Sequence, residues 1–340
     1  MRIGVARNGV AKIAVAALAL VAGLATVALP ATAAPREIRI GTISAANSPW
    51  DLAMRRFAEV AAKESDGELK VLVYTDGQLG DIQQMFSGMQ LGTLEMGYFG
   101  LGSAVLLKGA DPLNILYVPY LFKDKDWTTK ILNNDEFKKI YDDVAKNTGV
   151  RIVGAFGARS PRALQTVKGP ITKPEDVKGL RLRIPSIPAL KATFEALGAQ
   201  VTPLGMLEIY NGLSRGMIDG QDNGFDLSVP LKFHEVAKHW SATDHAYEMT
   251  GWFISERLWQ SLTPTQREAL TKAAAAGGEV STEATNKLDR ESIEALKAAG
   301  VTYTEPDREA FRTALKDVYK QFEGKMWPAG LVDRIRAMQQ

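Results

Sequence analysis

The fold is decided by residues 179–225, which read GLRLRIPSIPALKATFEALGAQVTPLGMLEIYNGLSRGMIDGQDNGF. Polar and apolar side chains alternate up to Ile184, as is typical of a strand, and Pro185 closes the run. Ser186 then supplies a helix cap, and apolar residues recur after it at helical spacing. Such alternation of strands and helices is typical of an α/β fold. The elements expected here are strands at 179–184, 200–204 and 217–220 and helices at 186–197 and 208–215.

The preceding half of the chain has the same alternation. Residues 37–43, 69–74 and 94–99 have strand patterns, and helix-forming stretches separate them. The first helix begins at Ser48, a capping residue that is followed by proline at the first helical position. The β-α-β-α-β order predicts an open, largely parallel sheet covered by helices. A further strand at 151–156 opens a second unit.

A long helix is predicted in the last third of the chain. Residues 263–266 form a capping box, and helix-favouring residues continue to about Ala299, weakened only at Gly277-Gly278. At 1.5 Å per residue the helix would be about 50 Å long, which exceeds one small domain. We therefore expect it to lie across two lobes. A last packed helix is expected from the spacing of Phe311, Leu315, Val318 and Phe322.

Composition limits the possible functions. The chain has 340 residues, enough for about two domains, and no cysteine, which excludes disulfides, thiolate metal sites and cysteine-linked lipids. Its histidines, His234, His239 and His245, are too few for a histidine-rich metal centre. The formal net charge of +2 gives no general attraction for nucleic acid or an anionic membrane.

The N-terminal segment has the pattern of a cleaved secretory signal. Three basic residues precede an uncharged apolar run from Ile13 to Leu29, and small residues follow at Ala31 and Ala33. The run is slightly short for a membrane span of about 20 residues, so a retained anchor is the less favoured alternative. We expect residues 1–33 to be a signal peptide that is removed after Ala33, and the product to be free in a bacterial periplasm.

The sequence lacks the common catalytic motifs. It contains no Gly-x-Ser-x-Gly elbow, no phosphate loop, no Gly-x-Gly-x-x-Gly and no His-Glu-x-x-His. His234 and His239 are five residues apart on a stretch expected to be helical, which does not align them well for a shared metal. Nothing in these residues demands an enzyme, a cofactor or a metal ion.

Polar residues gather instead at the ends of predicted strands, where α/β sheets usually present ligands. Arg159 and Arg162 follow one strand, Arg183 ends another, and residues 219–225 form a glycine-broken polar turn after a third. A guanidinium group fits a carboxylate with two parallel hydrogen bonds, and asparagine offers both a donor and an acceptor. The residues alone leave open whether this is a binding site or a set of surface charges with an ordinary turn.

Motifs spread over most of the chain resemble one protein family. They are Lys168-Gly-Pro-Ile, KPEDVKGLRLRIP at 173–185, EIYNGLSRGMIDGQDN at 208–223, Ser48-Pro-Trp, Gly77-Gln-Leu-Gly and Pro119-Tyr-Leu-Phe. In combination they resemble the extracytoplasmic solute receptors of tripartite ATP-independent periplasmic (TRAP) transporters. The resemblance implies two α/β lobes joined by crossing strands, a hinge and a long lobe-spanning helix, and closure over a small organic acid that the receptor delivers to the membrane subunits of a transporter.

The resemblance also implies site residues. Arg183 matches the strand-end arginine that forms the salt bridge to the ligand carboxylate, Arg162 matches a second arginine beside the ligand with Arg159 as the alternative, and Asn223 matches an asparagine that hydrogen-bonds the ligand. The chain departs from the family pattern at Met206, where an aromatic residue is common, and after Asn223, where proline is common. Further candidates for the pocket wall are Met206, Phe225, Asp226, Tyr98 and Phe99, for which core packing or simple exposure is the alternative.

The implied domain organisation is a first lobe at 36–158 plus about 247–285 and a second lobe at about 159–246 plus about 286–335. We expect a periplasmic monomer without cofactor. Two other functions stay open: an exported enzyme acting on an organic acid, and a ligand-binding subunit of a sensory system.

Overall fold

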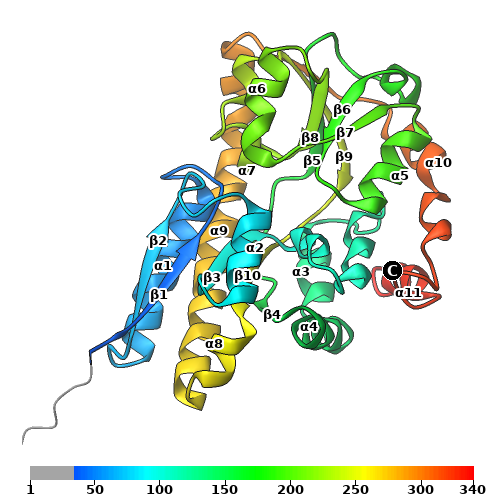
Figure 1. Ribbon diagram of the computed structural model, residues 1–340. Coiled ribbons are helices and arrows are strands. Elements are labelled where there is room, and N and C mark those ends of the chain that lie inside the picture. Colours follow the sequence, from blue (N-terminus) through cyan, green and yellow to red (C-terminus); the bar gives the residue numbers. More distant parts are fainter. Residues whose placement is uncertain (1–33) are drawn as a thin grey trace, which may run out of the picture. The chain divides into compact units, whose positions relative to one another are not determined.

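The computed structural model describes residues 34–340 (Figure 1), so the predicted signal peptide lies outside the described residues. Two β-sheets form, each flanked by helices, in the α/β arrangement that the sequence predicts. Within residues 34–340 no helix is long and apolar enough to cross a membrane. The helices are α1 (Pro49–Glu64), α2 (Ile82–Leu91), α3 (Lys125–Leu132), α4 (Asp135–Thr148), α5 (Pro188–Ala196), α6 (Ile209–Ser214), α7 (Phe225–Ser228), α8 (Glu256–Ser261), α9 (Pro264–Ala298), α10 (Arg308–Leu315) and α11 (Leu331–Ala337). Short 3-10 helices are η1 (Leu101–Leu106), η2 (Asp111–Tyr117), η3 (Pro174–Val177), η4 (Met206–Glu208), η5 (Phe233–Glu235) and η6 (Val318–Gln321).

The first sheet has the strand order β2-β1-β3-β10-β4. Four of its strands run in one direction, and β10 is antiparallel to both of its neighbours, β3 and β4. The sheet is therefore largely parallel, as predicted. Its strands are β1 (Arg36–Gly41), β2 (Leu69–Tyr74), β3 (Met96–Gly100), β4 (Val150–Gly154) and β10 (Thr250–Ser255).

The second sheet has the order β11-β9-β5-β8-β6-β7. Here β5 is the reversed strand, antiparallel to both β8 and β9, while β6 is parallel to β7 and β8. The chain passes between the sheets from β4 to β5, from β9 to β10, and through α9 to β11, so several segments cross without a flexible linker. The strands are β5 (Arg162–Thr166), β6 (Arg181–Ile184), β7 (Gln200–Pro203), β8 (Gly220–Asn223), β9 (His239–Ala246) and β11 (Thr302–Thr304).

Helix α9 confirms the predicted long helix and runs beside elements of both sheets (Figure 1). Its start is the predicted capping box, in which the Thr263 hydroxyl accepts from the Gln266 backbone N–H and the Gln266 side chain accepts from the Thr263 N–H. The glycine pair in its middle has a packing role. A Cβ at Gly277 would lie 2.7 Å from the Ala53 carbonyl oxygen of α1, so only glycine permits this close approach.

Two predicted elements are placed differently by the structure. The strand expected at 217–220 forms instead at Gly220–Asn223, because Met217 and Ile218 are occupied in ending α6: both backbone N–H groups donate to the Gly212 carbonyl. The last packed helix expected through Phe322 stops at Leu315. Phe311 and Leu315 pack in the core of the second sheet, whereas the next residues turn away to join the core of the first sheet, which α11 completes.

Candidate functional site

A cavity of about 300 Å³ lies between elements of the two sheets. The first-sheet side contributes the starts of α1 and α2, the end of β3, and η1 and η2. The second-sheet side contributes the ends of strands β6, β7 and β8 and the segments that follow them. The lining residues are Trp50, Asp81, Ile82, Gln83, Gly100, Ser103, Leu106, Tyr117, Arg159, Arg162, Arg183, Pro185, Ser186, Ile187, Pro203, Leu204, Gly205, Met206, Glu208, Asn223 and Leu227.

Strand direction explains why polar residues distant in sequence meet at this cavity. Strands β6, β7 and β8 are parallel, so their carboxyl ends share one edge of the sheet, where Arg183 and Asn223 lie. Strand β5 is antiparallel to β8 and its second residue, Ala163, pairs with Asn223. The beginning of β5, with Arg162, therefore lies at the same edge. Binding sites of open α/β sheets are typically found there.

Arg183 is a buried cation that lacks an anion. Its side chain is 2% exposed, and Nε and Nη2 donate to the Leu204 carbonyl oxygen at 2.8 and 2.6 Å. The remaining nitrogen, Nη1, has no hydrogen-bond partner, and the guanidinium forms no ion pair with a carboxylate of residues 34–340. Burial lowers the pKa of Arg183 to about 9, although Asp222 at longer range opposes the shift.

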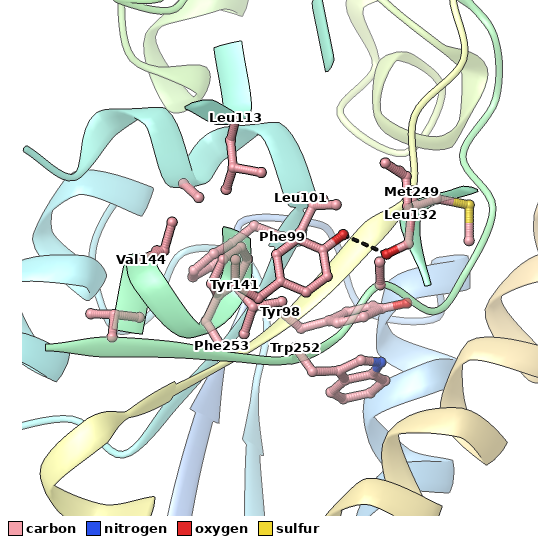
Figure 2. Close-up of a cluster of buried hydrophobic side chains, with 14 of the residues drawn as sticks. Tyr98, Phe99, Leu101, Leu113, Leu132, Tyr141, Val144, Met249, Trp252 and Phe253 are labelled. Atoms are coloured by element: carbon pink, nitrogen blue, oxygen red, sulfur yellow. Dashed lines mark hydrogen bonds between the residues drawn. The ribbon is translucent and has the colours of Figure 1, made fainter. Parts of the chain in front are cut away.

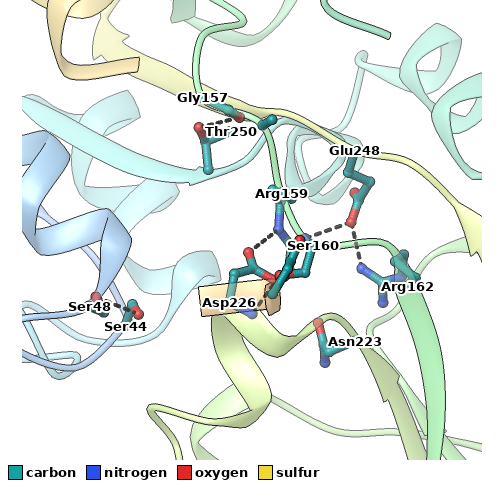
Figure 3. Close-up of polar contacts among 12 residues, drawn as sticks. Ser44, Ser48, Gly157, Arg159, Ser160, Arg162, Asn223, Asp226, Glu248 and Thr250 are labelled. Atoms are coloured by element: carbon teal, nitrogen blue, oxygen red, sulfur yellow. Dashed lines mark hydrogen bonds and ion pairs between the residues drawn. The ribbon is translucent and has the colours of Figure 1, made fainter. Parts of the chain in front are cut away.

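Arg159 and Arg162, by contrast, are already neutralised by the protein (Figure 3). Arg162 forms a double hydrogen bond to the Asp222 carboxylate at 2.7 and 2.9 Å, and Arg159 donates to Asp226 at 2.8 Å. Both arginines also donate to Glu248 Oε2 at 2.6 Å. Three buried carboxylates thus hold two buried guanidinium groups at the cavity wall, with Arg183 outside this network.

The same ion pairs control the ionisation of the buried acids. Burial alone would raise the pKa of Asp222, but Arg162 and a hydrogen bond with His245 outweigh burial and hold that pKa well below its usual value. Burial alone would also raise the pKa of Glu248, but Arg162 and Arg159 outweigh burial and lower that pKa. Both acids therefore stay charged at neutral pH.

Asn223 has an unused acceptor at the cavity. Its Nδ2 donates to Gln221 Oε1 at 2.7 Å, while Oδ1 is buried without a partner. Met206 also lines the cavity and its sulfur lies 3.9 Å from Asn223 Nδ2. The cavity therefore brings together Arg183, Arg162, Asn223, Arg159 and Met206 from the sequence prediction.

The other four candidates do not line the cavity. Phe225 stacks on Trp240 with ring centroids 4.2 Å apart, inside the core of the second sheet. Asp226 is fully buried as the partner of Arg159, so it is no free acceptor for ligand hydroxyls. Both were wrong as wall residues, because α7 turns these two side chains away from the cavity, while Leu227 of the same helix lines it.

Tyr98 and Phe99 were wrong as wall residues for a different reason. Figure 2 shows both among the buried hydrophobic side chains around Trp252 and Phe253. Because β3 is covered on both faces, successive side chains are both buried. The Tyr98 hydroxyl shares a 2.6 Å hydrogen bond with Thr250 Oγ1, and Phe99 packs edge-on against Phe86.

Sequence reasoning missed several lining residues. Trp50 lines the cavity, with the Arg159 guanidinium 5.3 Å from its ring centre. Tyr117 lies similarly beneath Arg162 at 5.7 Å. Trp50 follows the helix start at Ser48-Pro49 and Tyr117 lies two residues before Pro119, but periodicity alone does not distinguish a core face from a cavity wall. The histidines do not meet, and residues 34–340 hold no group of three potential metal ligands.

A cavity between two sheets of an α/β fold, with a buried cation that no carboxylate contacts, is typical of a site that binds an anionic ligand. Comparison with known proteins gives the family. Residues 40–325 match the bacterial extracellular solute-binding protein, family 7. The chain belongs to this family.

Two relatives cover nearly the whole chain. A solute-binding protein of Roseobacter denitrificans is 32% identical over 302 residues, which is 89% of this chain and 91% of the relative. The 2,3-diketo-L-gulonate-binding periplasmic protein of Escherichia coli is 30% identical over 322 residues, which is 93% of this chain and 95% of the relative.

Solved structures agree with the family assignment. A TRAP periplasmic solute binding protein from Ochrobacterium anthropi with bound L-fuconate has a TM-score of 0.84 at 29% identity and covers 90% of this chain and 100% of that one. One from Roseobacter denitrificans with bound L-galactonate has a TM-score of 0.82 at 28% identity, with coverages of 89% and 98%. The predicted two-lobed fold and the TRAP resemblance are confirmed. Members of the family are periplasmic solute-binding receptors, not enzymes, and serve TRAP transporters.

Proposed function

We propose that this protein captures a small organic acid in the cavity and delivers it to the membrane subunits of a TRAP transporter. The observation that carries the proposal is Arg183: a buried guanidinium at the cavity wall with one nitrogen, Nη1, that has no partner. A buried charge is costly unless it is paired. A ligand carboxylate supplies the missing anion, and the pair is strong because the Arg183 side chain is buried.

The charge balance supports a ligand with a single carboxylate. Arg159 and Arg162 are in direct ion pairs with Asp222, Asp226 and Glu248, whereas no carboxylate contacts Arg183, so Arg183 is the lining arginine that is available to a ligand anion. The rest of the lining mixes polar and apolar residues and offers no second unpaired cation, and Asp81 and Glu208 add negative charge. A second ligand carboxylate would meet these acids and be repelled. Hydroxyl groups, which both donate and accept, fit the same lining. The proposed ligand class is therefore a hydroxylated monocarboxylic acid.

Arg162 and Asn223 are proposed to orient the rest of the ligand. Arg162 uses four of its five N–H groups on Asp222 and Glu248, which leaves one Nη1 hydrogen for a ligand oxygen. Asn223 contributes its free Oδ1 as an acceptor for a hydroxyl. Arg159 keeps N–H groups free in the same way, and Met206 forms an apolar part of the wall.

The proposed mechanism is closure of two lobes over the acid. The first lobe comprises 36–158 plus about 247–285 and the second about 159–246 plus about 286–335, and the β4–β5 and β9–β10 connections are the hinge. Ligand stabilises the closed state only through contacts that the open state lacks. The protein acts as a periplasmic monomer after removal of residues 1–33, and it binds its ligand without changing it.

Three compounds with the same carbon skeleton test the proposal. Galactitol, galactonate and galactarate carry zero, one and two carboxylates. Both enantiomers of galactonate belong to the panel of aldonates that is tested. Protein purified from the periplasmic fraction is titrated by calorimetry and by thermal shift. The expected result is that at least one aldonate binds at least tenfold more tightly than its matched alditol and aldarate. Equal binding of the alditol would exclude carboxylate recognition, and tighter binding of the aldarate would exclude the monocarboxylate class.

A further inference from the structure

A second cavity, of about 320 Å³, lies away from the proposed ligand site, on the side of the molecule formed by α10 and α11 (Figure 1). Four separate segments build it: residues 120–123, the β9–β10 connection, α10 and the C-terminal helix α11 with the residues after it. Its lining residues are Tyr120, Leu121, Phe122, Lys123, Asp244, Tyr247, Arg308, Arg312, Arg336 and Gln339.

The lining is strongly basic. Lys123, Arg308, Arg312 and Arg336 face a single lining carboxylate, Asp244. Asp244 is taken by Arg308, with Nη2 and Oδ2 2.7 Å apart. Lys123 and Arg336 form no ion pair with any carboxylate of residues 34–340, and Arg312 reaches only the exposed Glu309 at 3.2 Å. A concave surface of one charge sign concentrates ions of the opposite sign.

Aromatic rings hold two of the arginines in place without neutralising them. The Arg312 guanidinium lies 4.6 Å from the centre of the Tyr120 ring, and that of Arg336 lies 5.0 Å from the centre of Tyr319. A guanidinium stacked in this way keeps N–H groups at its edge for an anion. Arg312 and Arg336 are therefore pre-positioned, which distinguishes them from freely moving surface side chains.

The backbone at this cavity is locally strained. Between Leu164 and Arg162 strand β5 advances two residues, while its partner β9 advances five, from Ser241 to Ala246, so β9 bulges there. Asp244, in the bulge, has φ of 44°, and Tyr120, which faces it, has φ of 55°. Each such non-glycine conformation costs about 1–3 kcal/mol and is typically retained at functional sites.

Tyr120 stabilises the bulge of β9 through two hydrogen bonds. Its backbone N–H donates to the His245 carbonyl at 2.8 Å, and its hydroxyl donates to the Thr243 carbonyl at 3.1 Å. The bulge thereby turns Asp244 toward Arg308 while its neighbour His245 turns inward to Asp222. The cavity is thus built by specific long-range contacts at a crossing between the two sheets.

We infer that this cavity is an accessory site for a small multivalent anion of the phosphate or polycarboxylate type, bound by Lys123, Arg312 and Arg336. Two or more negative charges match the cations that the protein leaves unpaired, and the volume admits a compact ion. The site is separate from Arg183, so the inference stands or falls independently of carboxylate capture.

The test uses inorganic phosphate and citrate as probes, at ionic strength held constant with sodium chloride. All proteins carry Arg183→Met, so that neither probe reports on the other cavity. Calorimetry compares this protein with a variant that adds Arg312→Gln and Arg336→Gln. A matched control instead adds Lys138→Gln and Lys146→Gln, which removes the same charge from exposed positions on α4.

The expected result is binding of at least one probe that weakens tenfold or more when the two arginines are replaced and changes less than twofold in the matched control. Thermal melts verify that each variant is folded, as expected because Arg312 is half-exposed. The inference is overturned if neither probe binds above the chloride background, or if the arginine and lysine variants lose affinity equally.

Discussion

Replacing Arg183 by methionine should weaken ligand binding without lowering the stability of the fold. Methionine keeps much of the side-chain length but removes the charge and the hydrogen bonds to Leu204. Most buried arginines are paired, and removing them destabilises the protein. Arg183 is not paired with a carboxylate in the ligand-free protein, so its removal should cost affinity but little or no stability.

The magnitude follows from the buried charge. The pKa of Arg183 falls to about 9 from 12.5, which corresponds to a cost on the order of 3–5 kcal/mol for keeping the cation buried. The unfolded arginine binds its proton more tightly than the folded one, so this cost applies in full at every pH below about 9. The substitution also removes the two hydrogen bonds to the Leu204 carbonyl, which lowers the free energy of unfolding by about 1–3 kcal/mol. Arg183→Met should therefore leave the free energy of unfolding unchanged or raise it by up to about 4 kcal/mol.

Arg162→Met is the matched comparison, because the residue type, burial and substitution are the same. This substitution removes the arginine partner of the Asp222 carboxylate and one of the two arginines that pair with Glu248. It should lower the free energy of unfolding by about 3–5 kcal/mol. Urea unfolding of both ligand-free variants measures the difference, and calorimetry measures binding. Arg183→Met should lower affinity by about 2–5 kcal/mol, which is roughly 30-fold to several thousandfold. Equal destabilisation by the two substitutions, or unchanged affinity in Arg183→Met, would refute the reasoning.

Three further predictions concern the surrounding residues. Asn223→Ala should weaken binding by about 1–2 kcal/mol because it removes the free Oδ1, and should lower the free energy of unfolding by about 1–3 kcal/mol because Gln221 Oε1 loses its donor; calorimetry showing a change below twofold would contradict a ligand contact. The pKa of Asp222 lies below the usual aspartate value of about 3.8, so its charge stabilises the fold above about pH 4 and this contribution is lost as the pH falls further. Unfolding free energy should thus fall less steeply between pH 4 and 2 in Asp222→Asn than in the parent protein, and parallel curves would show that the acid contributes nothing. Gly224→Ala places a Cβ 2.5 Å from the Ser160 carbonyl oxygen, so the β4–β5 connection must shift; it should lose stability and at least tenfold in affinity, and a ligand titration matching the parent would exclude this coupling.

The local parts of the fold were predictable from the sequence. Helix α9 was recognised because its capping box and its composition act within one segment. Arg183 was identified as a strand-end residue because β6 alternates regularly and ends at a proline. Such features depend on neighbours in sequence, which is the information that a single chain carries.

The polar strand β8 shows what periodicity cannot predict. Gln221, Asp222 and Asn223 are all buried, yet no alternation of apolar residues marks them as a strand. Their burial depends on partners such as Arg162 and His245, which are distant in the sequence. For the same reason the sequence could not tell that Arg162 is neutralised and Arg183 is not, although this contrast determines which arginine is available to a ligand.

The central claim is tested most directly by a crystal structure of the protein with a bound acid from the aldonate panel. The expected result is a single ligand carboxylate with an oxygen within about 3.2 Å of Arg183 Nη1, while Arg159 and Arg162 keep their bonds to Asp226 and Asp222. A ligand whose carboxylate lies elsewhere, with Nη1 still without an anion, would contradict the claim.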